Sequence, residues 1–330
     1  MPNHAGVTAR EPPRRGLLVV NPAARGRPFD RAGAVARRAG PRLALATLVT
    51  AGPGHAAGAV AEAVAAAADP FDLVLSVGGD GTAGEVAAGL ARLSHRPAPS
   101  PGSRPVPALL VVPAGTGNSV YRALWADRPW EEVLDDVLGP GRWRRRSLDL
   151  VRVVEADRLA LLGASAGFLA DVVAASEELD GVDGRERYQA AAAVALGRLQ
   201  PYPGRVLVDG EPLHDGRVTL AAVGGARHRA GTFEILPGSC LDDGLLDVCV
   251  VGAVAPERLA ELAGLVASGL HLGQPEVAYG RGTRVVLERD DGPLDFEHDG
   301  DRWAGAGGMV TLAVVPGAVP VCAPLVAPAG

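Results

Sequence analysis

The chain has 330 residues, enough for two domains that each bury a core, and its 48% hydrophobic and 21% charged residues are typical of soluble globular proteins. Its net charge of −6 argues against a general nucleic-acid-binding protein. All 32 basic residues are arginine. The chain therefore contains no Walker lysine, no Schiff-base lysine and no protein-kinase lysine.

The cysteines and the two ends of the chain favour a cytoplasmic protein. Cys240, Cys249 and Cys322 have neither metal-ligand nor CxxC spacing, which is typical of reduced, buried thiols. No signal peptide precedes the first apolar run. Residues 304–330 carry no charge, but their four prolines argue against a membrane-spanning helix, and we expect a strand at Val310–Val315.

The first 146 residues alternate between predicted strands and helices. A polar leader, residues 1–13, is expected to be disordered. The predicted strands are 17–20, 43–49, 73–77 and 108–112, and the predicted helices are 31–39, 54–68, 83–93, one from 119, and 130–138. A proline-rich loop covers 94–107. The alternation predicts a doubly wound α/β nucleotide-binding domain over 14–146, with a parallel sheet between two layers of helices.

Three of these strands end in turns that suit a phosphate group. The turns are Asn21-Pro22, Gly78-Gly79-Asp80-Gly81-Thr82 and Pro113–Asn118. Glycines let backbone N–H groups approach an anion, the following helix adds a partial positive charge, and ligands of open α/β sheets bind at this edge. Asp80 has no evident capping role, so a divalent cation beside the phosphate would explain it. The alternative is an ordinary turn with Asp80 at its surface.

After Asp149 the pattern changes to short strands, which predicts a mostly antiparallel β domain over 147–315. The predicted strands are 151–154, 159–162, 205–209, 218–223, 245–251, 284–288, 294–298 and 309–315, separated by turns such as 209–210, 243–244, 291–292 and 299–300. Two helices, 187–199 and 256–270, carry apolar stripes that core packing explains, with a lipid-lining role as the alternative. Residues 316–330 form a proline-rich tail, for which a return to the first domain is one option.

Together these motifs resemble the bacterial diacylglycerol kinase catalytic-domain family, within the diacylglycerol and sphingosine kinase superfamily. The order is that of the family: Asn21-Pro22, Gly78–Thr82 with Glu85, Pro113–Asn118, Gly167-Phe168 with Asp171, and Leu241-Asp242-Asp243-Gly244-Leu245-Leu246-Asp247. The resemblance covers about residues 14 to 320. NAD kinases share the Gly-Gly-Asp-Gly-Thr element, but the later element, Leu241–Asp247, points to the lipid kinases.

The resemblance implies an α/β nucleotide domain and a β-sandwich lipid kinase domain, with ATP and a diacylglycerol-like lipid alcohol meeting between them. The implied ATP-contacting residues are Asn21, Pro22, Ala23, Ala24, Arg25, Thr50, Gly78, Gly79, Asp80, Gly81, Thr82, Ala83, Gly84 and Thr116. The implied ligands of a structural Mg²⁺ are the carbonyls of Cys240 and Leu245 and the Asp243 carboxylate. The family's general base is the glutamate of an Asp-Gly-Glu turn, which reads Asp299-Gly300-Asp301 here. Asp301 and Asp80 are thus the expected catalytic residues.

The chain departs from the family pattern at two positions. Ser119 stands where the family usually has aspartate. Asp301 places its carboxylate one methylene further back than a glutamate would, and a base must come within about 2.6–3.2 Å of its hydroxyl. Glu297 is a less suitable substitute for the base. Without the resemblance, Asp301 and Asp243 are explained as ordinary turn residues.

The sequence is consistent with three functions. An ATP-dependent lipid kinase is the first hypothesis, NAD kinase the second, and a nucleotide- or lipid-binding protein that has lost catalysis the third. The run Arg142–Arg146 is explained either by transient contact with anionic lipid at the inner face of the membrane, with Trp143 at the interface, or by a solvated linker. The sequence leaves the oligomeric state open, a homodimer included, as well as the acyl-chain and head-group preference of the lipid.

Overall fold

The computed structural model describes residues 12–24, 26–94, 105–179, 181, 184–229, 233–266 and 268–325. The chain divides into two units, the first made of residues up to Leu148 together with those from Ala318 onward, and the second of Asp149–Gly317. Two long strands, β5 (Trp143–Val153) and β15 (Met309–Pro324), contribute residues to both units.

The sheet of the first unit is parallel, as the alternation predicts. Its order is β4-β3-β1-β2, with strands β1 (Arg15–Val20), β2 (Ala44–Val49), β3 (Leu73–Gly78) and β4 (Ala108–Pro113). All six residues of β3 are buried, which is what its apolar run predicts for an inner strand of a parallel sheet. The end of β15 extends the sheet, with Val321 opposite Leu109.

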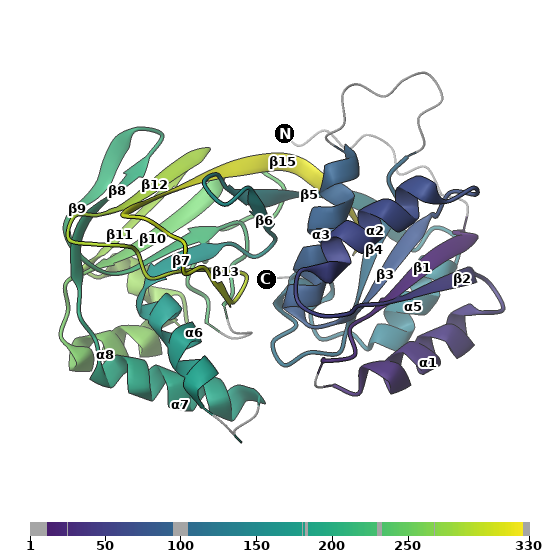
Figure 1. Cartoon of the computed structure of the whole chain (residues 1–330), viewed down its shortest axis with the longest axis horizontal. Coiled ribbons are helices and arrows are strands. Elements are labelled where there is room, and N and C mark those ends of the chain that lie inside the picture. Colours follow the sequence, from purple (N-terminus) through teal and green to yellow (C-terminus); the bar gives the residue numbers. More distant parts are fainter. Residues whose placement is uncertain are drawn as a thin grey trace. The chain divides into compact units, whose positions relative to one another are not determined.

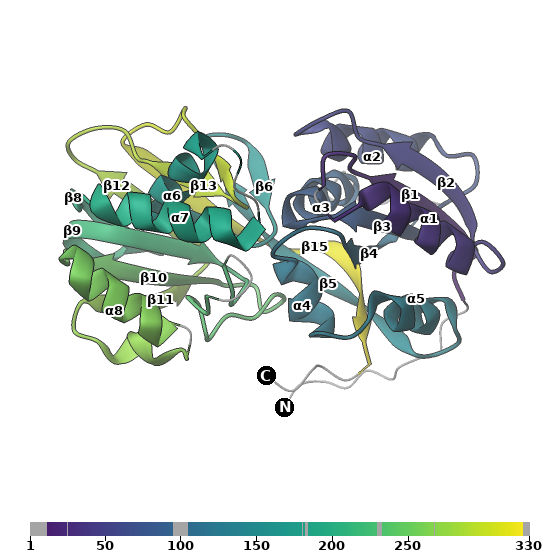
Figure 2. The same cartoon turned by 90° about the horizontal axis from the view of Figure 1, so that it is seen from below.

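Helices cover both faces of this sheet. The five are α1 (Pro28–Ala39), α2 (His55–Ala66), α3 (Asp80–Ser94), α4 (Ser119–Trp125) and α5 (Trp130–Leu138). Helices α2 and α3 pack together over one face, whereas α1 and α5 lie over the other (Figures 1 and 2). The doubly wound prediction is therefore confirmed. The predicted start of the third helix at Ala83 is wrong, because α3 begins at Asp80 and its first turn contains Gly81 and Thr82.

The second unit is a β-sandwich with helices on one outer face (Figure 2). Its strands, besides its parts of β5 and β15, are β6 (Arg158–Ala160), β7 (Ala164–Gly167), β8 (Tyr202–Val208), β9 (Glu211–Gly224), β10 (Leu246–Gly252), β11 (Val277–Gly282), β12 (Arg284–Arg289), β13 (Phe296–His298) and β14 (Asp301–Arg302). One run of paired strands has the order β14-β13-β7-β9-β8-β12-β15, and β10 pairs with both β9 and β11. Strands β7, β11 and β14 do not appear among the predicted ones.

The helices of the second unit are α6 (Phe168–Glu178), α7 (Gly184–Gly197) and α8 (Pro256–Val266), followed by the 3₁₀ turn Leu270–Gly273. The prediction of two helices is wrong, because α6 is a third. The predicted stripe of α8 is only partly buried. Leu259 and Leu262 lie in the core, but Leu270 is 63% exposed and lies beyond the end of the helix.

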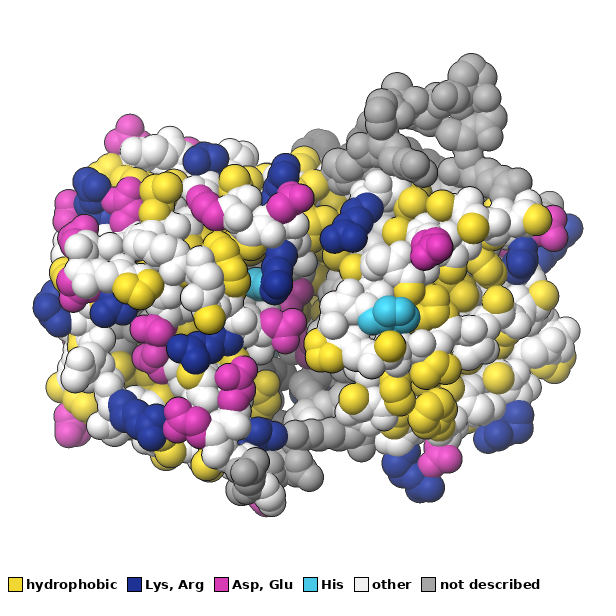
Figure 3. All heavy atoms as spheres, in the orientation of Figure 1, with side chains coloured by type: hydrophobic (Ala, Val, Ile, Leu, Met, Phe, Trp, Pro, Cys, Tyr) yellow, Lys and Arg dark blue, Asp and Glu magenta, His cyan; other side chains and the backbone are white. Residues whose placement is uncertain are grey.

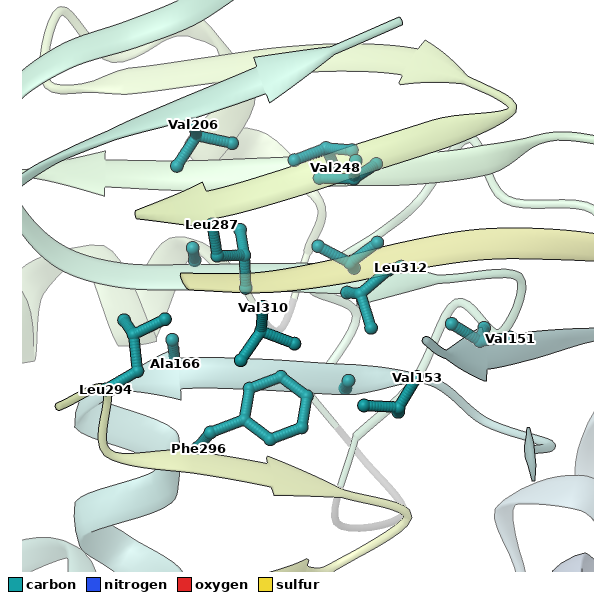
Figure 4. Close-up of a cluster of buried hydrophobic side chains, with 14 of the residues drawn as sticks. Val151, Val153, Ala166, Val206, Val248, Leu287, Leu294, Phe296, Val310 and Leu312 are labelled. Atoms are coloured by element: carbon teal, nitrogen blue, oxygen red, sulfur yellow. The ribbon is translucent and has the colours of Figure 1, made fainter. Parts of the chain in front are cut away.

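Alternating residues of β9 and β10 pack into two separate hydrophobic cores, because successive side chains of a strand point to opposite faces of the sheet. Ala221, Val223 and Val248 face the interior of the sandwich, with the residues shown in Figure 4. Leu220 and Cys249 face the other way and pack against α8. Figure 4 shows Phe296 of β13 and Val310 of β15 in the sandwich core.

Most of the Arg142–Arg146 run is a β-strand with a buried tryptophan, so the predictions of a solvated linker and of Trp143 at a lipid interface are wrong. Residues from Trp143 onward form the start of β5, and the Trp143 side chain is buried, at 7% exposure. Arg144 Nε donates to the carbonyl of Pro324 at 3.2 Å, and Arg145 donates to the carbonyl of Val106. These arginines hold the strand to neighbouring chain segments.

The predicted strand Val310–Val315 is confirmed but is too short. β15 continues through two prolines to Pro324 because it changes partners on the way. Residues up to Ala313 pair with β12, whereas Val321 pairs with β4. Pro316 and Gly317, which has a φ of 58°, lie between these two stretches, and β15 also pairs with β5.

The surface of the second unit mixes charges. On the face shown in Figure 3, acidic and basic side chains are interspersed. Partly exposed ion pairs such as Arg205–Glu288, at 2.7 Å, and Arg258–Glu276, at 3.1 Å, stabilise such surfaces only slightly. Within the described ranges, no helix combines the length and the apolar composition needed to cross a bilayer.

Candidate active site

The three predicted phosphate turns lie together at the carboxyl ends of β1, β3 and β4. These strands are neighbours in the sheet, so their last residues meet at one edge. The N–H of Asn21 donates to the carbonyl of Val77 at 3.2 Å, and the N–H of Ala114 donates to the carbonyl of Gly78 at 2.8 Å. The side-chain amide of Asn21 donates to Thr82 Oγ1 at 2.9 Å. The turns thus form one structure rather than three separate ones.

Two of these turns touch at glycines. A Cβ added to Gly115 would lie 2.3 Å from Gly79 Cα, which is far inside contact distance. The backbones of the two turns are therefore in direct contact, and a side chain at Gly115 would push the turns apart. A Cβ placed on Gly79, immediately before α3, would meet backbone atoms of Gly115 and no side chain of the described residues within 4 Å. Such a surface suits an anion at the start of a 15-residue helix.

Gly115→Ala is expected to lower the affinity for ATP by at least about tenfold and to destabilise the protein by roughly 1–3 kcal/mol, since the overlap requires backbone movement. Isothermal titration and thermal unfolding would measure the two effects. Gly58→Ala in α2 is the matched control, because a Cβ there meets nothing within 4 Å. That substitution is expected to leave ATP affinity unchanged and to stabilise the helix by about 0.5–1 kcal/mol. Normal ATP binding by Gly115→Ala would contradict the role of this contact.

Asp80 has a capping role that the sequence does not reveal. Its Oδ2 accepts the N–H of Ser119 at 2.9 Å and its Oδ1 accepts the N–H of Val120 at 3.0 Å, so both oxygens cap the start of α4. The prediction that Asp80 lacks such a role is therefore wrong. Glu85, one turn further along α3, does the same for α2 through Gly54 and Ala56, at 2.7 and 2.9 Å.

Ser119 fits this arrangement through its backbone. The N–H of Ser119 binds Asp80, and its hydroxyl is buried with no hydrogen-bond partner among the described residues. The preceding Asn118 has a left-handed φ of 51°, and its side chain exchanges hydrogen bonds with the backbone of Gly115 at 2.9 and 3.0 Å. Asn118 thus shapes the third turn, Pro113–Asn118.

The other predicted nucleotide residues lie at or near the same edge. Thr50 follows β2 directly and is buried, and the side-chain oxygen of Asn21 accepts the N–H of Ala23 at 2.9 Å. Ala83 and Gly84 are buried within α3, so only the exposed start of that helix is open to a ligand. Arg25 lies outside the described residues.

The carboxylates of Asp149 and Asp243 hold the aspartate-rich loop before β10 in place. Asp149 accepts the N–H of Gly244 through one oxygen and the N–H of Gly317 through the other, both at 2.7 Å. Asp243 forms an ion pair with Arg281, and its other oxygen accepts the N–H of Leu245 at 3.1 Å. Arg281 Nε also lies 3.1 Å from the fully buried Asp247.

The predicted Mg²⁺ ligands in this loop are all oxygens, namely the carbonyls of Cys240 and Leu245 and the Asp243 carboxylate, and oxygen ligands are what Mg²⁺ prefers. The donor set therefore fits the ion, although the ion would have to compete with Arg281 for Asp243. Among the described residues, no three His, Cys, Asp or Glu side chains converge as a ligand set.

Asp301 is exposed at the start of β14, directly after the two-residue turn Asp299-Gly300. Both turn residues have positive φ, 50° and 86°, which is the geometry that an Asp-Gly hairpin predicts. The Asp299 carboxylate accepts the N–H groups of Leu161, Leu162 and Gly163 at 2.6–3.1 Å. Burial raises the pKa of Asp299 to about 6, against the effect of these three donors.

Asp171, in the first turn of α6, is a titratable group whose unusual pKa the sequence does not reveal. Burial raises its pKa to about 6, and the nearby negative charge of Asp295 adds to the shift, while Arg289 and Arg302 act against it. Because the folded-state pKa lies above the unfolded value of 3.8, this carboxyl stabilises the fold fully below about pH 4. The contribution is lost as the pH rises through about 6.

Asp171→Asn removes that titration. The free energy of unfolding of the wild type, relative to that of the variant, is expected to fall by about 1–3 kcal/mol between pH 4 and pH 7, since one pKa unit corresponds to about 1.4 kcal/mol. Urea unfolding of both proteins at several pH values would measure the difference. A difference that stays constant with pH would contradict the raised pKa.

Comparison with known proteins agrees with this architecture. A family model described as the diacylglycerol kinase catalytic domain matches residues 15–152, and one described as the YegS C-terminal NAD kinase beta sandwich-like domain matches residues 163–323. A solved structure from Bacillus anthracis strain Sterne superposes with a TM-score of 0.71 at 18% identity, covering 94% of this chain and 98% of that one, which shows the shared fold. These matches define a kinase with an α/β domain followed by a β-sandwich domain.

Curated relatives narrow the class. A YegS-like lipid kinase of Xanthomonas oryzae is 31% identical over 246 residues, which cover 73% of this chain and 75% of that protein. The diacylglycerol kinase of Bacillus subtilis is 28% identical over 239 residues, which cover 71% and 74%. The chain belongs to the family of diacylglycerol kinases and YegS-like lipid kinases, and it is an enzyme of the lipid kinase class.

Proposed function

We propose that the protein transfers the γ-phosphoryl group of ATP to the hydroxyl of a lipid alcohol, with diacylglycerol as the default acceptor. The observation that carries the proposal is the joined set of turns at the ends of β1, β3 and β4, connected by Asn21, by Asp80 and by the contact of Gly79 with Gly115. Phosphoryl transfer depends on positioning and on charge stabilisation, and it needs little covalent chemistry from the protein.

The nucleotide residues of this proposal are those at the sheet edge. The N–H groups at Gly79 and at the start of α3 would bind phosphate oxygens, assisted by the positive end of the helix. The turn from Asn21 to Arg25, Thr50 and Thr116 would hold the rest of ATP. Because the chain contains no lysine, no lysine ammonium group takes part in phosphate binding, and the backbone N–H groups of the turns are the proposed donors.

A Mg²⁺ ion bound with ATP would neutralise charge on the phosphates. Both Asp80 oxygens already accept backbone N–H groups, so we propose that Asp80 orients that ion through water rather than directly. The Asp243 loop would hold a second, structural Mg²⁺ ion. Asp243 would then bind this ion in place of Arg281. The proposed function of Asp301 does not depend on that second site.

Asp301 is proposed as the general base. Its carboxylate would take the proton of the lipid hydroxyl while the hydroxyl oxygen forms a bond to the γ-phosphorus. The bond from that phosphorus to the oxygen bridging it to the β-phosphate breaks, so the products are ADP and the phosphorylated lipid. Aspartate is shorter than the family's glutamate, so the position of the turn backbone determines whether the carboxylate reaches the hydroxyl.

Incubation with γ-labelled ATP and a panel of lipid alcohols in detergent micelles tests this function. Diacylglycerol, monoacylglycerol and sphingosine would form the panel, and label is expected in at least one lipid. ATP binding without transfer to any lipid would support the alternative of a member that has lost catalysis.

A further inference from the structure

A buried carboxylate lies directly behind the turn that carries Asp301. Glu297, on β13, is 5% exposed, and its Oε1 accepts the hydroxyl of Ser165 on β7. Its Oε2 accepts the N–H of Gly300 at 2.8 Å. The same side chain thus connects the neighbouring strand to the residue immediately before Asp301.

This position excludes Glu297 as a substitute for the base. Both of its carboxylate oxygens are bound within the unit, and burial raises its pKa. A carboxylate that is enclosed and bound to Ser165 and Gly300 does not offer an oxygen to a lipid hydroxyl. What Glu297 does instead is fix the backbone of the turn.

Asp299 restrains the turn from the other side. It binds the three N–H groups of residues 161–163, and its own N–H donates to the carbonyl of Gly163 at 2.9 Å. The buried guanidinium of Arg229 packs beside this segment, where a Cβ on Gly163 would lie 2.2 Å from Arg229 Nη2. Residue 301 therefore follows a turn held at Asp299 by one set of contacts and at Gly300 by Glu297.

We infer that Glu297 is a positioning residue for Asp301: by accepting the N–H of Gly300 it sets the place from which the aspartate carboxylate meets the acceptor hydroxyl. The inference rests on the proposed role of Asp301 as the base. A shorter base tolerates less backbone displacement, and misplacement of a reacting group by about 1 Å can cost 10²-fold in rate. Loss of the Glu297 bond therefore affects catalysis beyond its effect on stability.

The test compares Glu297→Leu with Glu297→Gln. Leucine removes both hydrogen bonds at similar volume, and kcat for diacylglycerol phosphorylation is expected to fall by about 10–100-fold with KM for ATP changed less than about twofold. Glutamine can still accept from Gly300 and can donate to Ser165, so it is expected to stay within about threefold of the wild type. Glu288→Leu, at an exposed ion pair on β12, is the matched control for the loss of a carboxylate.

Hydrogen exchange of the peptide 296–303 gives a readout that does not depend on activity. The Gly300 amide is expected to exchange at least about tenfold faster in Glu297→Leu, and at the wild-type rate in Glu297→Gln. In an Asp301→Ala background, Glu297→Leu is expected to cause no further loss of the residual rate, because no base remains to be positioned. An independent loss in that background would show a merely structural role and overturn the inference.

Two outcomes separate this inference from the proposed function. If Asp301→Ala abolishes transfer while Glu297→Leu keeps the wild-type kcat, the positioning role is wrong and the proposed base stands. If Asp301→Ala keeps full activity, the proposed base is wrong, and the positioning role is wrong with it.

Discussion

Asp301→Ala is expected to lower kcat for diacylglycerol phosphorylation by about 10²–10⁴-fold, the range that a positioned general base contributes. The fold should remain intact, because Asp301 is exposed and the turn is held by Asp299 and Glu297. Initial rates with γ-labelled ATP measure the effect, and thermal unfolding confirms that the variant is folded.

Two further substitutions in the same unit serve as controls for this prediction. Asp215→Ala removes an exposed aspartate from β9 of the same unit and is expected to leave kcat unchanged. Asp301→Glu restores the side-chain length usual in the family and is expected to keep or raise the rate. An Asp301→Ala variant within about threefold of the wild type would show that the base lies elsewhere.

Asp80→Asn is expected to lower phosphoryl transfer by at least about 10²-fold and to destabilise the protein by roughly 1–3 kcal/mol. Asparagine keeps one acceptor oxygen, so its NH₂ group must face one of the two N–H donors, Ser119 or Val120, and leave that donor unpaired. The loss of transfer has a separate cause, since the amide carries no charge to orient a cation through water. Rates corrected for the folded fraction, together with unfolding curves, measure the two effects.

Glu85→Gln is the matched control for Asp80. It lies on the same helix and caps α2 through Gly54 and Ala56, as Asp80 caps α4. A similar loss of stability is expected for it, without the loss of transfer per folded molecule. If Asp80→Asn behaves in the same way, Asp80 serves only as a helix cap.

The parts of the fold that local sequence determines were predictable. The apolar run of β3 predicts a buried inner strand, and all of its residues are buried. The turns Asp209-Gly210 and Asp299-Gly300 both join antiparallel neighbours through positive φ, as their residue types predict. Here the signal lies within a few residues of the feature that it predicts.

The errors come from long-range contacts. Asp80 caps residues that follow it by 39 and 40 positions, so nothing near it in the sequence reveals the cap. Trp143 stands in a run of arginines that suggests an exposed segment, yet β-pairing buries it. The prolines of β15 suggest an end to the strand, but Pro316 lies between the stretch that pairs with β12 and the residue that pairs with β4.

The candidate site shows the same division. The three glycine and asparagine turns could be predicted to meet, because parallel strands bring their ends to one edge. The burial of Glu297 against Ser165 could not, since that contact spans 132 positions and depends on the pairing of β13 with β7, which is absent from the predicted strands. The ion pair of Asp243 with Arg281 could not be predicted either. The two residues lie 38 positions apart, and Arg281 is in β11, which is absent from the predicted strands.

The most direct test of the central claim is a single incubation of the wild-type protein with γ-labelled ATP, Mg²⁺, diacylglycerol in detergent micelles and NAD at equal concentration. Transfer of label to the lipid hydroxyl, giving a labelled phosphatidic acid, is the predicted result, with none in NADP. Label in NADP, or ATP binding with no labelled product, would contradict the account.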